Sequence, residues 1–124
     1  MNVSDYLGKP WVAMEYDCWG LVRDVYAREL DIHLPRVLIN ARHSRLVIHE
    51  FASSKIFTRF EKLKEPQHLC VVTMASGQHM NHVGVYIETH SIPHILHNQS
   101  GSGVVCAPLY ELKDKILDYY RFKQ

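Results

Sequence analysis

One run of apolar residues at helical spacing, followed by six short β-rich runs, constrains the fold of this chain more than any other feature. The apolar positions of the first run recur at intervals of three and four, at Trp19, Val22, Tyr26 and Leu30. This spacing places side chains on one face of an α-helix. Asp17 precedes the run and is a suitable N-cap, while Pro35 follows it. We therefore predict a helix of about four turns that starts after Asp17.

The second half of the chain is rich in β-forming residues. Six short runs, separated in most cases by Gly, Ser, Asn or Pro, cover residues 57–63, 68–74, 82–88, 94–98, 103–109 and 115–122. A further helix is predicted over residues 42–54. Helices followed by a series of strands are typical of the α+β class. We expect N-terminal helices packed on a mostly antiparallel sheet of about five to six strands.

Length and composition limit the organisation of the chain and its partners. With 124 residues, of which 47% are hydrophobic and 22% charged, residues 1–124 are expected to form a single domain. The formal net charge of +1 indicates no nucleic-acid partner. No apolar run approaches the ~18 residues of a membrane span, so no membrane insertion is expected.

The three cysteines, Cys18, Cys70 and Cys106, have neither the spacing of a metal site nor the even number of a disulfide framework. Cys70 and Cys106 lie in apolar strand patterns, which favours a packing role. Cys18 lies at the first turn of the predicted helix. There the unpaired N–H groups and the helix dipole are expected to lower the thiol pKa below its free value of ~8.5. Cys18 is therefore either a packing residue or a nucleophile.

A thiolate nucleophile needs a base, and His82 is the strongest candidate among nine histidines. It opens the stretch "HVGVYIE", in which Val83 and Val85 face one side of a strand and His82 and Gly84 the other. A glycine inside a strand indicates a close neighbour, and the helix that carries Cys18 is a candidate for it. From the residues alone, His82 is either such a base or a strand-edge histidine with no specific partner.

Strand parity indicates which residue could orient His82. If Leu96 shares the core of the valines in the His82 strand, an antiparallel hairpin of residues 82–88 with 94–98 places His97 beside His82. We therefore expect His97 to be the orienting residue.

Other polar residues near His82 are less suitable. His94 and Asn98 have the opposite parity and are expected to point away. Glu88 has the right parity but lies roughly 20 Å along the strand, at ~3.3 Å per residue. A weaker alternative is a metal site with the ligands His90, His94 and His97. Zinc sites favour helical or knuckle spacing, whereas Pro93 interrupts this segment.

Three motifs resemble the NlpC/p-sixty family of papain-like cysteine peptidases. They are "YDCWGLV" (16–22), "MNHVGVYI" (80–87) and "ILHNQSGSGVV" (95–105), in the family's order of Cys, His and a third polar residue. The chain is most similar to small members from tailed-phage and prophage tail clusters, through "LGKPW", "RELDIHLP" and "ILDYYR". The resemblance implies a papain-like NlpC-type fold, with Cys18 as nucleophile, His82 as base and His97 as orienting residue.

The family's activity implies cleavage of peptidoglycan stem peptides, commonly between D-glutamate and a diamino acid. The Cys18 thiolate and the His82 imidazolium are expected to coexist as a pair, and no metal or organic cofactor is required. The oxyanion and substrate side is expected to be lined by Trp11, Tyr16 and Asp17. Trp11 stands where the family often has a tyrosine, and Met14 and Glu15 replace a usual glycine pair. These departures concern substrate fit and leave the triad intact.

The resemblance also implies a partner and a location. Because the substrate lies outside the cytoplasmic membrane and the chain shows no signal-peptide pattern, we expect assembly in the host cytoplasm. The protein would join the virion tail tip through the tail-tip hub protein and act on the cell wall or periplasm. Segment 40–66, where Phe57 and Phe60 flank Arg59 and have the pattern of exposed residues, is the expected attachment surface. The alternative is that these aromatic side chains complete the core, above all Phe57.

Three alternatives to this function remain. The chain could be a non-catalytic structural tail-tip component, or a free lysis or toxin-like cell-wall amidase. It could also be an acyltransferase, which is disfavoured because the related lipid acyltransferases place their histidines before the cysteine.

Overall fold

The computed structural model describes residues 1–36, 57–76, 79–88 and 92–124. Its helices are α1 (Cys18–Leu30) and the short α3 (Leu109–Leu112). The strands are β1 (Phe60–Leu63), β2 (Val71–Ser76), β3 (His79–Ile87), β4 (His94–Gln99), β5 (Gly103–Pro108) and β6 (Ile116–Phe122). Single 3-10 turns cover Val3–Asp5, Phe57–Arg59 and Lys113–Lys115.

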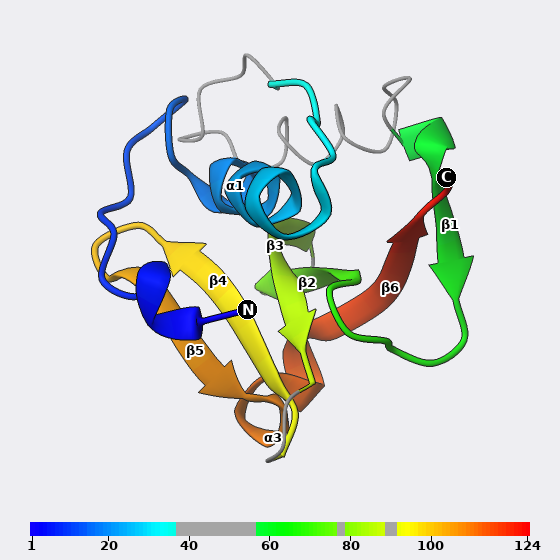
Figure 1. Ribbon diagram of the computed structural model, residues 1–124. Coiled ribbons are helices and arrows are strands. Elements are labelled where there is room, and N and C mark those ends of the chain that lie inside the picture. Colours follow the sequence, from blue (N-terminus) through cyan, green and yellow to red (C-terminus); the bar gives the residue numbers. More distant parts are fainter. Residues whose placement is uncertain (37–56, 77–78, 89–91) are drawn as a thin grey trace.

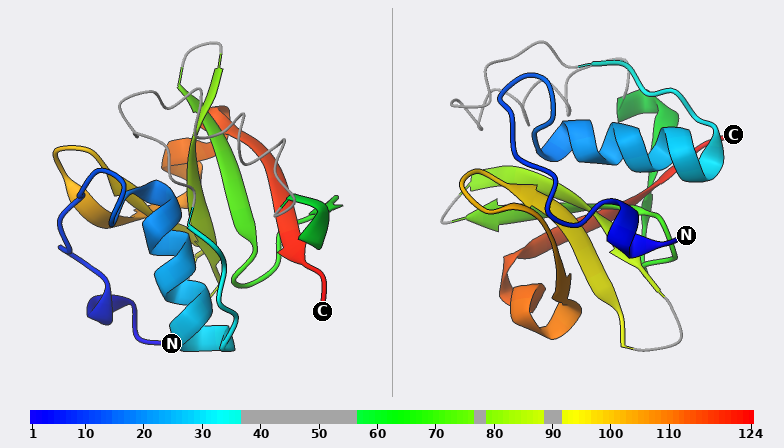
Figure 2. Two further views of the ribbon diagram at one scale, coloured as in Figure 1. Left: turned by 90° about the horizontal axis from the view of Figure 1, so that it is seen from above. Right: turned by 60° about the vertical axis from the view of Figure 1, so that its left-hand side comes forward.

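The six strands form one antiparallel sheet in the order β1-β6-β2-β3-β4-β5. Strands β2 to β5 follow one another as a meander, and β6 returns to lie between β1 and β2. Figures 1 and 2 show the sheet curling beneath α1, with β4 and β5 on one side and β6 and β1 on the other. This is the predicted α+β arrangement. Within the described ranges, no helix combines the length and apolarity needed to cross a bilayer.

Helix α1 begins and ends with local signals in the sequence. The Asp17 carboxylate accepts a hydrogen bond of 2.8 Å from the Gly20 N–H, which confirms the predicted N-cap. The helix ends at Leu30, and its C-cap Asp31 has a left-handed conformation with φ 54°, so the helix stops before Pro35 is reached. The helix predicted over residues 42–54 lies outside the described residues.

The core lies on both faces of the sheet. Helix α1 packs on the face that carries Val83, Val85 and Leu96. The opposite face carries Tyr86 and Ile95 and is covered by α3 through its buried residue Leu112, so the strand alternation predicted for residues 82–88 is confirmed. The molecule therefore has a central sheet with a larger layer on the α1 face.

The aromatic residues expected to be exposed near Arg59 need a correction. Phe60 is only 5% exposed, and its ring packs against those of Tyr26 and Phe122, with centroid separations of 6.3 and 5.4 Å. Strand β1 begins at Phe60, and its first side chain points into the core beneath α1. Arg59 is exposed and stacks on Phe122, 4.8 Å from the ring centroid. The Phe57 side chain lies outside the described part of the chain.

Candidate active site

The candidate site lies where β3 and β4 part. Pairing between the two strands ends at Gly84 and His97. Beyond this pair, β3 continues beside β2 through Val83 and His82, while β4 continues beside β5 through Asn98. The start of α1 contacts both strands at this gap (Figure 1). The gap therefore brings a helix N-terminus and two strand ends together.

Cys18 is the first residue of α1, and its side chain is almost completely buried, at 8% exposure. Burial raises the pKa of the Cys18 thiol to about 12, and the neighbouring Asp17 carboxylate acts in the same direction. The Val83 backbone N–H, which hydrogen-bonds the thiol, acts in the opposite direction. The expectation of a lowered thiol pKa is therefore wrong, because desolvation of the thiolate outweighs the N–H groups at the helix start.

His82 and His97 form a hydrogen-bonded pair. His82 Nε2 and His97 Nδ1 lie 2.9 Å apart, and the two rings are nearly perpendicular, at 80°. The β3–β4 hairpin thus places His97 beside His82 as strand parity predicted.

Burial disfavours the protonated form of both imidazoles. Burial lowers the pKa of His82 to about 3, with the charges of His97 and Lys115 acting in the same direction. Burial likewise lowers the pKa of His97 to about 4, again with Lys115 adding to the effect. Burial therefore disfavours the charged form of the thiol and of both rings, which opposes the expected thiolate and imidazolium pair.

Gly84 allows the close approach of β4 at this point. A Cβ atom on Gly84 would lie 2.9 Å from Ile95 Cγ2, 2.9 Å from the Leu96 carbonyl oxygen and 3.1 Å from His97 Cβ. The close neighbour of Gly84 is thus β4, and the prediction that it could be the helix carrying Cys18 is wrong. A side chain at position 84 would push His97 away from its place beside His82.

The three predicted lining residues lie in the segment that leads into α1. Trp11 is half-buried. The Tyr16 hydroxyl donates a hydrogen bond of 2.7 Å to Asp24 Oδ2, which also binds Lys9 Nζ at 3.1 Å. The Asp17 carboxylate is buried and used as the helix cap. Of the three, Asp17 is brought next to Cys18, while the Tyr16 hydroxyl is held by Asp24.

Sequence reasoning missed two residues of this site. Asn98 is fully buried and donates hydrogen bonds from Nδ2 to the carbonyl oxygens of Tyr16, at 2.8 Å, and Asp17, at 3.4 Å. Asn98 lies two residues after Leu96 on β4, so the two side chains are on the same face of the strand. This correctly indicated that Asn98 points away from His82, and it also directs the Asn98 side chain toward the start of α1. Lys115 acts on both histidines by its charge. No sequence signal placed it there, since its position depends on the register of β6 with β2.

The alternative of a histidine metal site finds no support in the described geometry. Within the part of the chain that the structure describes, no three His, Cys, Asp or Glu side chains gather as metal ligands. His94 Nδ1 lies 2.7 Å from the Ile92 carbonyl oxygen, and His97 is bonded to His82. His90, the third candidate ligand, lies outside the described residues.

A buried thiol at a helix start, bonded to the N–H of the residue that follows His82 on β3, and a histidine pair at the same end of an antiparallel sheet are the arrangement of a papain-like α+β domain. The family model described as "NlpC/P60 family" matches residues 6–115, so the chain belongs to the NlpC/P60 family. Members of this family are typically cysteine peptidases that act on the cell wall.

One solved structure supports the fold. It is a Staphylococcus aureus subsp. aureus Mu50 protein described as "similar to lipoprotein, NLP/P60 family", which is 21% identical to this chain with a TM-score of 0.61. The match covers 98% of this chain and 39% of that protein, so the chain spans well under half of its length. No curated protein matches the chain.

Proposed function

We propose that this chain hydrolyses peptidoglycan stem peptides, with the bond between D-glutamate and a diamino acid as the expected target. The observation that carries the proposal is the 2.9 Å contact between His82 Nε2 and His97 Nδ1, one residue along β3 from Val83, whose backbone N–H hydrogen-bonds the Cys18 thiol. Membership of a family whose members are typically cysteine peptidases supports the same assignment.

In the proposed reaction, Cys18 is the nucleophile and His82 the acid–base group. Since His97 engages Nε2 of His82, Nδ1 would receive the thiol proton as Sγ attacks the amide carbonyl carbon. His82 then protonates the leaving amine, and the C–N bond breaks to leave a thioester on Cys18. Water, deprotonated by His82, attacks the thioester and releases the carboxylic acid and the thiol. His97 would fix the tautomer and ring orientation of His82.

The neutral form of the Cys18 thiol and of His82 before the reaction determines how the proton moves in the first step. Because burial raises the thiol pKa to about 12 and lowers that of His82 to about 3, proton transfer would accompany the attack on substrate. The developing oxyanion would be bound by the Cys18 backbone N–H at the helix start. The Trp11 indole N–H is the side-chain donor we propose beside it, because the Tyr16 hydroxyl is bonded to Asp24.

The direct test is release of new amino groups from purified peptidoglycan fragments. The wild-type protein is expected to release them, whereas Cys18→Ala should abolish release and keep the thermal midpoint, since alanine replaces a small buried side chain. Cys70→Ala is the matched control, because Cys70 is also a buried free cysteine but lies outside the gap. Release by Cys18→Ala would contradict the mechanism. No release by the wild type would favour a non-catalytic structural component.

We also propose that the protein is delivered at a phage tail tip and opens the wall from there. The support is the similarity of "LGKPW", "RELDIHLP" and "ILDYYR" to small tail-cluster members. The exposed Arg59, stacked on Phe122, lies in the described part of the expected attachment surface. Co-expression with the tail-tip hub protein, followed by pull-down with and without Arg59→Glu, tests it. Absence from mature particles would point to a free lysis or toxin-like amidase.

A further inference from the structure

Asn98 ties the turn before α1 to the sheet. It is the first β4 residue beyond the point where β4 leaves β3, and its side chain is fully buried. Its Nδ2 group donates to the Tyr16 carbonyl oxygen at 2.8 Å and to the Asp17 carbonyl oxygen at 3.4 Å. These are the two carbonyls that immediately precede the Cys18 residue.

The bond to Asp17 constrains the peptide that carries the Cys18 N–H. The Asp17 carbonyl and the Cys18 N–H belong to one planar peptide unit, so fixing the carbonyl direction fixes the N–H direction. Both carbonyls already have a backbone partner: Val12 N–H donates to Tyr16 at 2.9 Å, and Leu21 N–H donates to Asp17 at 3.0 Å. Asn98 is therefore not needed to satisfy these groups, and what it adds is a link between the turn and β4.

The oxygen atom of the Asn98 side-chain amide indicates that packing alone does not explain an asparagine at this position. Its Oδ1 atom is buried and has no hydrogen-bond partner among the residues that the structure describes. A buried unsatisfied acceptor destabilises the folded state, whereas an apolar side chain of the same size would not.

We propose that Asn98 is a positioning residue for the nucleophile. By holding the turn at residues 16–18, it sets the Cys18 thiol against the Val83 N–H and aims the Cys18 N–H at the place of the oxyanion. Its effect on hydrolysis rests on the proposed function, but its effect on the Cys18 thiol does not.

Thr73 provides a matched control on the same sheet. It is also fully buried, and its hydroxyl bridges β2 and β6 by donating to the Asp118 carbonyl oxygen and accepting from the Asp118 N–H, both at 3.2 Å. The buried side chains of Thr73 and Asn98 thus both connect neighbouring segments of the chain by hydrogen bonds. Only Asn98 contacts the turn that carries Cys18.

The first experiment measures kcat and KM of Asn98→Leu on a stem-peptide fragment. Leucine keeps the number and branching of the side-chain heavy atoms and removes the donor, so kcat is expected to fall about 10- to 100-fold, the range for a displaced reactive group. KM should stay within about twofold, because the substrate surface is unchanged. Thr73→Val should keep both constants within about twofold, even if its thermal midpoint falls. A kcat of Asn98→Leu within about twofold of wild type would overturn the proposal.

The second experiment needs no hydrolysis. Iodoacetamide labelling at pH 8 is followed at Cys18, with Cys106 in the same molecule as the reference. Release of the turn should expose the buried thiol and raise the Cys18 to Cys106 labelling ratio at least about threefold in Asn98→Leu, with no change in Thr73→Val. An unchanged ratio overturns the positioning role. If the wild-type protein hydrolyses no peptidoglycan fragment but the labelling ratio is raised in Asn98→Leu, the positioning role is supported and the proposed peptidase function is rejected. If Asn98→Leu does not fold, Asn98→Ala, which adds no atoms, is measured in its place.

Discussion

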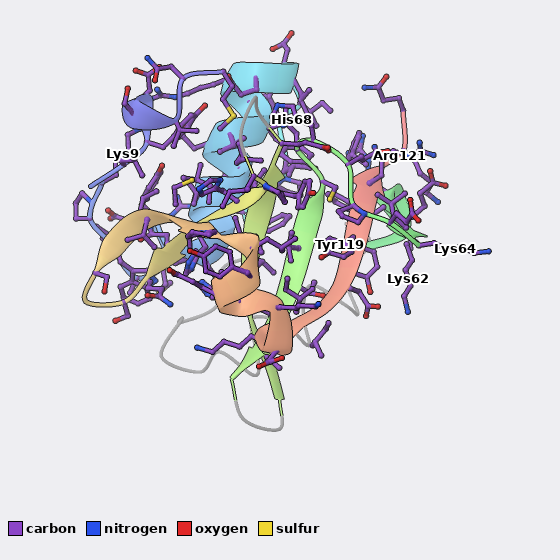
Figure 3. The ribbon with its side chains drawn as sticks, turned by 90° about the horizontal axis from the view of Figure 1, so that it is seen from below. Lys9, Lys62, Lys64, His68, Tyr119 and Arg121 are labelled. Carbon is purple, nitrogen blue, oxygen red and sulfur yellow. The ribbon has the colours of Figure 1, made fainter. Side chains whose placement is uncertain are left out.

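Polar side chains are buried in one part of the sheet and exposed to solvent in another. At the gap between β3 and β4, His97, Asn98 and Asp17 are buried. At the β1–β6 edge, Lys62 Nζ lies 3.0 Å from Asp118, and Arg121 is paired with Glu61, with both cations exposed and both carboxylates partly exposed. Figure 3 shows Lys62, Lys64 and Arg121 extending from this edge.

The difference distinguishes the buried polar residues that form the candidate site from the polar residues that form ion pairs at the surface. Exposed ion pairs are screened by water and salt, and contribute little to stability. Buried polar groups destabilise the fold unless they are bonded, and they perturb the pKa values of their neighbours. Substitutions should therefore have large effects on hydrolysis at the gap and small effects at the edge.

After the complete loss expected from Cys18→Ala, the largest effect is expected from the histidine pair. His82→Ala should lower kcat by about 10³- to 10⁴-fold, near the upper range for general acid–base catalysis. His97→Ala should lose less, since water can partly replace an orienting group but not the base. Steady-state kinetics on a stem-peptide fragment measure both. Equal and complete losses would show that His97 does more than orient, and no loss in His97→Ala would move the orienting role elsewhere.

The pH dependence of Cys18 alkylation is the next test. Burial raises the pKa of this thiol to about 12, so the thiolate fraction should increase about tenfold per pH unit between pH 7 and 10. The rate of iodoacetamide labelling at Cys18 should follow it without a plateau. A plateau below pH 8 would reveal a thiolate–imidazolium pair and contradict the neutral site.

Acid should destabilise the protein through the buried histidines. Their folded pKa values, about 3 for His82 and about 4 for His97, lie below the unfolded value of about 6.5. The unfolded chain therefore binds more protons in this window, so this stability is complete above pH 6.5 and is lost as the pH falls towards about 4 for His97 and about 3 for His82. The slope should reach about 1.4 kcal/mol per pH unit for each histidine.

Chemical denaturation across this range compares wild type with two variants. His97→Gln should reduce the slope, whereas Thr73→Val removes no titratable group and should leave it unchanged. Equal slopes in all three proteins would mean that His97 is protonated in the folded state.

The smallest effect is expected at the edge. Glu61→Gln removes the charge that pairs with Arg121, and should change the free energy of unfolding by less than about 1 kcal/mol. The kcat should be unchanged. A thermal midpoint measured at low and high salt checks this, because any loss should shrink as salt screens the pair. A loss of hydrolysis would show that the edge and the gap are coupled.

Local patterns in the sequence predicted the elements and one contact of the site. The helix after Asp17 follows from its apolar spacing and cap, and the β3–β4 hairpin from alternation. The same alternation placed His97 beside His82, because a strand reverses the face of every second side chain.

The remaining features depend on how distant segments pack. The Cys18 thiol was expected to be acidic because the helix start is a local feature, but its burial comes from the sheet beneath it. The point at which β4 leaves β3 has no local signal, so the role of Asn98 was not predicted. Lys115 directly precedes β6 and lowers the pKa values of both histidines by its charge. Its position depends on how β6 pairs with β2, and this pairing exists only in the assembled sheet.

The bond between Asn98 and Tyr16 joins positions 82 residues apart, and this separation has a consequence for synthesis. A growing chain exposes its Cys18 segment at the ribosome long before residue 98 has been translated. Closing so large a loop is entropically costly, and it can occur only when the later strands are available. During translation the thiol therefore lacks both its histidines and the amide that holds its turn. A newly made chain should gain its reactive centre abruptly, late in folding, and should have no hydrolytic activity as a nascent polypeptide.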